Sequence, residues 1–173
     1  MRAVGPPIID LVDLYPAKAI ASVHQDPTEP MPARDEAMTL REFGPQAVDA
    51  LLAVAGPGVD VPLIIAEIRL MGGALTRPGE HDSAVGGRHG GFNVCVIGPY
   101  PPPLVAAVDA CSRDVLDALR PWADGGSLIN FQGYATAPER VRAAWSGPVR
   151  DRLEAIKRAR DPGGLFNFAH PVA

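Results

Sequence analysis

The hydrophobic and polar positions along the chain follow patterns that are typical of both strands and helices. Apolar residues are nearly continuous from Val61 to Met71, and Phe92 to Ile97 forms a second apolar run. Runs of this length, bounded by glycine and proline, predict buried strands. Shorter β-compatible segments lie at residues 7–15, Met38 to Phe43 and Leu128 to Phe131. The chain is therefore predicted to contain a β-sheet.

Helical spacing is found in other segments. From Leu104 to Leu119, apolar residues recur at intervals of three and four, which predicts a long amphipathic helix. Pro45 begins a second predicted helix, which Gly56 ends. Two further helices are predicted at Pro138 to Trp145 and Pro148 to Arg160. The predicted buried stripe of the last helix consists of Val149, Leu153 and Ile156.

Several predicted strands follow one another without a helix between them. This order favours an α+β fold, in which an antiparallel sheet carries its helices on one face. The other face of such a sheet is free for a ligand or another domain. Residues 25–35, with three prolines, are predicted to be an exposed loop, and residues 76–91 a polar loop. The length of 173 residues fits a single domain over residues 1–173.

Composition narrows the possible functions. A net charge of -4 argues against general binding to nucleic acids, which needs a basic surface. No apolar run approaches the ~20 residues of a membrane span, and no signal peptide is evident, so a cytoplasmic protein is expected. Cys95 and Cys111 lie in apolar contexts and are expected to be free, buried thiols. The four histidines form no helical pair, so no metal site is expected.

Glu67 and Arg69 are the charged residues of the strongest predicted strand. Residues two apart in a strand share a face, so the carboxylate and the guanidinium lie side by side. One interpretation is an ion pair that satisfies itself or faces solvent. The other is a catalytic pair in a substrate cavity, with Arg69 binding an anionic or carbonyl oxygen and Glu67 acting as acid or base.

Two further groups are candidate substrate-binding residues. Asn130 is predicted to lie mid-strand between apolar residues, where an amide needs a partner. It either contacts a ligand together with Phe131 and Tyr134 or fixes a neighbouring loop. Arg88 and His89 lie in the run Gly-Gly-Arg-His-Gly-Gly, whose glycines let backbone N–H groups approach an anion. The alternative is a loop that becomes ordered only against another domain.

Four segments in the last third of the chain resemble the berberine-bridge-type family of FAD-linked oxidases. Leu128 to Gly133 is similar to the Tyr-x-Asn-Phe/Tyr strand of that family, and Ala144 to Gly147 to its Tyr/Trp-Gly turn. Arg152 to Lys157 matches its Arg-Leu-x-x-Ile/Leu-Lys helix, and Asp161 to Phe166 resembles its Asp-Pro-x-Asn-x-Phe motif. These segments occur in the family order, and they define a berberine-type C-terminal segment at about residues 128–168.

The middle of the chain extends the resemblance. Ala66 to Ala74 is similar to the Glu-x-Arg-x-x-Gly-Gly-Ala strand of the family, and Ser83 to Arg88 resembles its Thr-Ala-Phe-x-His-Arg loop. The resemblance implies the substrate domain of the vanillyl-alcohol-oxidase-like flavoprotein fold, an antiparallel sheet whose open face covers the flavin. It also implies that FAD binds to a separate domain, and nothing in this sequence resembles that domain. Leu128 replaces the family Tyr that commonly serves as catalytic base, which departs from the usual oxidase chemistry.

Three hypotheses of function follow from this resemblance. In the first, the chain binds a small natural product and pairs with a separate FAD-binding chain. In the second, it is a flavin-independent cyclase or isomerase that needs no cofactor. In the third, it is a non-catalytic binding module that forms a homodimer through its uncovered sheet face.

Overall fold

The computed structural model describes most of the chain, namely residues 5–6, 10, 13–20, 22, 29–77, 80, 83–133 and 138–167. The chain forms two compact units, Met1–Met31 and Pro32–Ala173. The described part of the first unit includes a short 3₁₀ helix, Ala17–Ala19. A strand was predicted at residues 7–15. Residues 13–15 are not in a strand, and most of the other residues of this segment lie outside the described residues. The single domain over residues 1–173 stays a prediction.

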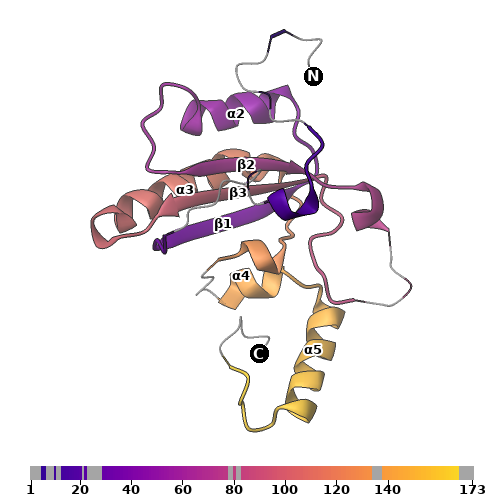
Figure 1. Ribbon diagram of the computed structural model, residues 1–173. Coiled ribbons are helices and arrows are strands. Elements are labelled where there is room, and N and C mark those ends of the chain that lie inside the picture. The colour runs from indigo at the N-terminus through magenta and orange to yellow at the C-terminus, as the bar shows by residue number, and fades with distance from the viewer. Residues whose placement is uncertain are drawn as a thin grey trace. The chain divides into compact units, whose positions relative to one another are not determined.

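The second unit contains an antiparallel sheet of β1 (Ala33–Leu40), β2 (Ile65–Leu70) and β3 (Phe92–Pro99). The strand order is β1-β3-β2, so β3 lies in the middle (Figure 1). Phe92 pairs with Leu40 of β1 and with Leu70 of β2, which fixes the register across the sheet. The central strand is the most buried of the three, whereas the strongest strand predicted from the sequence, Val61 to Met71, lies at the edge.

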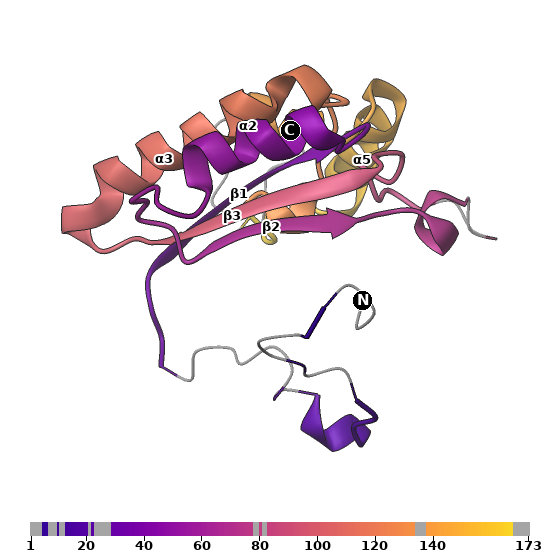
Figure 2. The ribbon, with the colours of Figure 1, turned by 90° about the horizontal axis from the view of Figure 1, so that it is seen from above.

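Two helices cover one face of this sheet, α2 (Pro45–Ala55) and α3 (Val105–Leu119), as Figure 2 shows. The predicted α+β fold with helices on one face is confirmed. Pro45 begins α2 because its fixed φ suits a first helical turn. The core between the helices and the sheet consists of Leu40, Ala47, Val94, Val96, Val115, Leu116 and Leu119. Val115 and Leu119 are core positions that the apolar spacing predicts, whereas Leu116 was not predicted.

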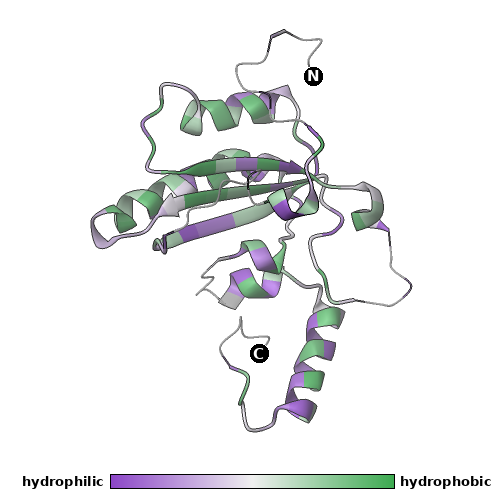
Figure 3. Cartoon of the chain, in the orientation of Figure 1, coloured by the Kyte–Doolittle hydropathy of each residue, from purple (hydrophilic) through white to green (hydrophobic). Residues whose placement is uncertain are grey.

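β1 begins earlier than predicted. Its first half carries Arg34, Asp35 and Glu36, which are coloured hydrophilic in Figure 3 and give no apolar strand signal. Glu36 is nevertheless only 6% exposed, because Arg34 and Arg140 hold its carboxylate at 2.9 and 3.0 Å. Charge pairing across the fold thus permits a buried strand where the sequence predicts a loop. The predicted loop at residues 25–35 is wrong from residue 33 onward.

β2 is an edge strand, although its sequence predicts a largely buried one. The ordered strand covers Ile65–Leu70, shorter than the apolar run from Val61 to Met71. Leu70 is 74% exposed and Ile65 is 41% exposed. The cause is topological: in the part of the chain that the structure describes, β2 pairs with β3 alone.

The strand predicted at Leu128 to Phe131 is a 3₁₀ turn, Ile129–Phe131. The N–H of Phe131 bonds to the carbonyl of Leu128 at 2.9 Å instead of to a neighbouring strand. The segment crosses the sheet face opposite α2 and α3, where Nε2 of Gln132 donates to the carbonyl of Ala37 at 3.4 Å. That face was predicted to be free, yet Ala37 and Cys95 are buried on it. Within the described residues, its β2 side is the part that stays open.

The chain continues into α4 (Pro138–Ala143) and α5 (Gly147–Arg160). Apolar and charged residues alternate along α5 in Figure 3. The predicted buried stripe of α5 is only half-buried, and Ile156 is 49% exposed. A small cavity separates this stripe from Ser83 and Ala84, the loop that faces it. One loop covers less of a helix than a sheet would, which explains the exposure.

The Asp161 to Phe166 motif ends α5. The Asp161 carboxylate accepts hydrogen bonds from the N–H groups of Leu165 (2.7 Å) and Phe166 (3.1 Å). Lys157 of the preceding turn pairs with the same carboxylate and donates to the carbonyl of Phe166 at 2.6 Å. The pKa of Asp161 is lowered, chiefly by the Lys157 hydrogen bond. The motif therefore folds the chain back over the last helical turn.

Candidate functional site

The sheet face opposite α2 and α3, called the distal face below, carries the predicted catalytic pair. Alternation along each strand selects the residues that point to it. Its β1 and β3 part lies under the segment from Ser127 to Gly133. The strand residues of the distal face are Asp35, Ala37, Thr39, Ile65, Glu67, Arg69, Asn93, Cys95 and Ile97.

Glu67 and Arg69 lie side by side on the open β2 part of the distal face. Nε of Arg69 donates to Oε1 of Glu67 at 2.8 Å, and Nη2 lies 2.7 Å from the same oxygen. The guanidinium also lies over the ring of Phe131, with Cζ 4.9 Å from the ring centroid. The sequence-predicted residues Glu67, Arg69 and Phe131 thus form one group.

This group can act on a ligand because it remains accessible. The side chains of Arg69 and Glu67 are 47% and 38% exposed. Among the described residues, no hydrogen bond to Oε2 of Glu67 is found, so this oxygen can accept a proton. An exposed pair of this kind adds only ~0–1 kcal/mol to stability. Its geometry equally suits a solvent-facing ion pair, the alternative that the sequence left open.

Buried polar atoms lie beside this group. Asn93 pairs in register with Arg69 and with Thr39, and it is 1% exposed. Its Oδ1 has no hydrogen-bond partner in the described residues. Cys95, its neighbour on the same face, is a free thiol whose pKa burial raises to about 11. Cys95 is therefore a neutral packing group at neutral pH.

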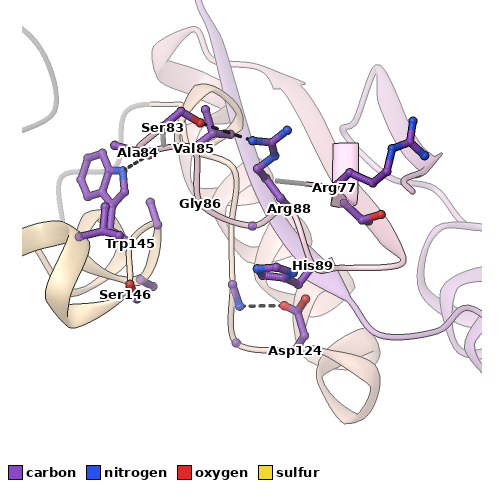
Figure 4. Close-up of a pocket in the computed structure, with 17 residues that line it drawn as sticks. Arg77, Ser83, Ala84, Val85, Gly86, Arg88, His89, Asp124, Trp145 and Ser146 are labelled. Carbon is purple, nitrogen blue, oxygen red and sulfur yellow. Dashed lines mark hydrogen bonds between the residues drawn. The ribbon is translucent and has the colours of Figure 1, made fainter. Parts of the chain in front are cut away.

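Arg88 and His89 lie in a different place, a cavity of about 570 Å³. Figure 4 shows Trp145 on one side of this cavity and Arg88 and His89 on the other. Its wall combines the loop of residues 83–89 with residues 124–126 and with the turn between α4 and α5. Glu67, Arg69 and Phe131 do not line it. The predicted site residues therefore divide into two groups.

Glycine packing builds the cavity wall. A Cβ at Gly86 would lie 1.5 Å from the carbonyl oxygen of Ala144, so only glycine fits there. A Cβ at Gly87 would lie 2.6 Å from the carbonyl oxygen of Ser127. The indole N–H of Trp145 donates to the carbonyl of Ala84 at 2.8 Å and fastens the loop from the other side. The loop is thus fixed within the described residues themselves.

Arg88 is held in the cavity by neutral acceptors. Its Nε donates to the carbonyl of Leu75 at 2.7 Å, and Nη1 lies 3.4 Å from the Ser83 hydroxyl. No carboxylate pairs with Arg88 in the described part of the chain, so its charge is available to a ligand. His89 is exposed, and the Arg77 side chain extends away from Arg88 (Figure 4). The cavity can hold a small polar or anionic molecule.

Asn130 and Tyr134 are the two remaining substrate-binding residues predicted from the sequence. Asn130 is exposed in the 3₁₀ turn, so its predicted position in the middle of a strand is wrong. Tyr134 lies outside the described residues. The substrate-binding and catalytic roles themselves stay predictions. Sequence reasoning missed Trp145 and Asn93, although an amide inside the apolar run of β3 was a visible signal.

Within the described residues, no group of three His, Cys, Asp or Glu side chains is arranged to hold a metal ion. No helix in this part of the chain combines the length and hydrophobicity that crossing a lipid bilayer demands.

Comparison with known proteins gives matches at the level of structure. Neither a protein-family model nor a curated protein matches the chain. A variant of BBE-like 1 from Physcomitrella patens matches with a TM-score of 0.62 and 18% identity, over 88% of this chain and 33% of that protein. Carbohydrate oxidase from Microdochium nivale, in complex with a substrate analogue, matches with a TM-score of 0.60 and 18% identity, over 85% of this chain and 33% of that protein.

These matches establish the fold. The chain spans about a third of the length of either oxidase. It has the fold of a part of the berberine bridge enzyme-like oxidases, as the sequence resemblance implies. At this identity the likeness concerns the fold alone.

Proposed function

We propose that this chain is the substrate-side part of a berberine-bridge-type FAD-linked oxidase and works with a partner chain that binds FAD. The observation that carries the proposal is the structural match, which covers most of this chain and only a third of each oxidase. The open β2 part of the distal face, with Glu67, Arg69 and Phe131, then forms one wall of the active site. Its substrate is a small natural product.

The residues of the distal face suit the flat ring system of FAD and not its pyrophosphate. Arg69 is the sole cation among its strand residues, and Glu67 already pairs with it. The strand residues of this face therefore offer no group of cations that could bind the pyrophosphate of FAD. The partner chain has to bind that pyrophosphate. The Phe131 ring and the planar guanidinium suit contact with a flat ring system or with the substrate that lies on it.

When bound, FAD would accept two electrons from the substrate. The task of this chain is to position that substrate and to move its proton. The Nη N–H groups of Arg69 can bind a substrate oxygen, and the free Oε2 of Glu67 can accept the proton. Leu128 has no hydroxyl, so Glu67 is the residue in this group that can replace the missing Tyr of the resembled family.

The proposal is tested with a tagged chain isolated from the cells that produce it. The account predicts a complex with visible flavin absorbance and about one flavin per chain. The Glu67→Gln variant should keep the flavin but lose roughly 100-fold or more in turnover, as expected when a general base is removed. Arg142→Met, an exposed substitution on α4, is the matched control and should retain full turnover. A chain isolated without flavin, or full turnover in Glu67→Gln, would contradict the proposal.

A second candidate function rests on the cavity around Arg88. Its volume of about 570 Å³ lies in the range of small-molecule sites. A flavin-independent cyclase or isomerase would use this cavity, with Arg88 holding an anionic group and His89 nearby. Such an enzyme would convert its substrate without flavin and would lose that activity in Arg88→Met. A requirement for added flavin would refute this second candidate.

A further inference from the structure

The free edge of β2 is defined by the register of the sheet. The N–H of Met71 bonds to the carbonyl of Gly91 at 2.9 Å. In an antiparallel ladder the direction of the backbone groups alternates, so Glu67 and Arg69 also direct theirs toward β3. The backbone groups of Ala66, Ile68 and Leu70 therefore point away from β3, to the outer edge. Within the described residues, no strand pairs with these N–H and C=O groups.

The side chains along this edge are apolar and exposed. Leu70, Ile64 and Ile65 are 74%, 52% and 41% exposed. Figure 3 shows hydrophobic colouring along β2, interrupted by a hydrophilic stretch. Natural proteins protect such edges with charged side chains, bulges, prolines or a covering segment, because an open apolar edge recruits a further strand. No proline lies within Ile65–Leu70, and the irregularity of the ladder, where the Ile64 N–H bonds to the Ile97 carbonyl at 2.8 Å, is confined to the start of β2. Glu67 and Arg69 are the charged residues of this strand, so a partner strand has to match their charges.

The sequence of β2 is complementary to itself. If a second copy pairs antiparallel with Ile68 opposite Ile68, the outward backbone groups of both strands meet as hydrogen-bonded pairs. In the same register, Glu67 of each copy lies opposite Arg69 of the other, on the same face. Opposite charges in directly facing positions stabilise an antiparallel pair. The exposed Leu70 then lies opposite Ala66.

We propose that β2 is a dimerisation strand: two copies of this chain pair antiparallel through β2 about Ile68 and join their sheets into one. The twofold axis is perpendicular to the sheet, so the helices of both copies lie on the same side. The distal faces of both copies then form one continuous surface with four alternating charges, Glu67 and Arg69 from each copy. This assembly goes beyond the proposed oxidase function and uses the edge of the sheet, not its face.

The first test weakens strand pairing at the β2 edge and leaves the fold of each copy intact. Ala66→Pro removes one outward N–H without breaking the bonds to β3, since proline is tolerated at an edge when its N–H side faces solvent. Sedimentation velocity over a range of concentrations should show a wild-type dimer. In Ala66→Pro the dissociation constant should rise by roughly tenfold or more, with an unchanged circular dichroism spectrum. Ala66→Thr keeps the N–H and is the matched control, which should dimerise like the wild type.

A charge-swap pair gives a second readout that does not depend on proline. Glu67→Arg places like charges opposite each other and should weaken the dimer about tenfold. Adding Arg69→Glu restores opposite charges in every facing position and should recover most of the affinity. A monomer at every concentration would overturn the proposal, as would a dimer that Ala66→Pro leaves intact. A dimer that Glu67→Arg weakens but the double swap does not rescue would also contradict the register about Ile68.

Discussion

The Glu36–Arg140 ion pair joins α4 to the sheet, and Arg140→Met should measure what this contact contributes. The Glu36 side chain is 8% exposed and that of Arg140 is 29% exposed, with 3.0 Å between Nη1 and Oε2. Breaking a buried pair costs ~3–5 kcal/mol when the remaining charge has no other partner. Here Arg34 stays 2.9 Å from the same carboxylate, so the loss should be smaller. We expect Arg140→Met to lower the free energy of unfolding by about 2 kcal/mol, close to the value of one charged hydrogen bond.

Urea unfolding, followed by circular dichroism, measures this loss at a fixed m-value. Arg142→Met on the same short helix is the control, because Arg142 is exposed and makes no ion pair in the described residues. It should change stability by less than about 0.5 kcal/mol. A double-mutant cycle with Glu36→Gln should give a coupling of about 1 kcal/mol or more. Equal losses in Arg140→Met and Arg142→Met, or a coupling near zero, would refute the pairing.

Two further predictions concern the loop and the C-terminal turn. Gly86→Ala places a Cβ 1.5 Å from the Ala144 carbonyl oxygen, so it should destabilise the fold by ~1–3 kcal/mol in a thermal melt; a Tm equal to that of the wild type would contradict the packing. Asp161 has a lowered pKa, so its contribution is complete above the pKa of the unfolded chain and is lost as pH falls through the folded value. The protection factors of the amides after α5, which compare their exchange rates with the intrinsic rates at the same pH, should therefore fall at acidic pH, and Asp161→Asn should remove this pH dependence.

The sequence predicted the parts of the fold that depend on local spacing. The apolar positions of α3 at intervals of three and four predicted the helix and its buried residues Val108, Val115 and Leu119. Alternation along β2 placed Glu67 and Arg69 on one face, and the structure pairs them at 2.7 Å. These are short-range properties of a helix or a strand. No knowledge of distant residues is needed for them.

Other features depended on contacts between distant residues, so the sequence could not reveal them. The strand at Glu36 required Arg140, a cation more than a hundred positions away. The burial predicted for β2 failed because topology, and not composition, decides which strand is central. Phe131 reaches Arg69 because residues 129–131 form a turn that crosses the sheet. The apolar character of the same residues, taken alone, predicts a strand. The close packing of Gly86 likewise depends on a distant residue, Ala144, whose carbonyl oxygen leaves no room for a side chain.

The most direct measurement of the proposed function is photolabelling with an azido-substituted FAD in the complex isolated from the producing cells. The proposal requires the flavin ring to lie against the open part of the distal face. It predicts that peptide mapping finds the label on β2, between Ile65 and Leu70, or on the turn that carries Phe131. Label confined to α2 or α3, or a complex that takes up no flavin, would contradict the account.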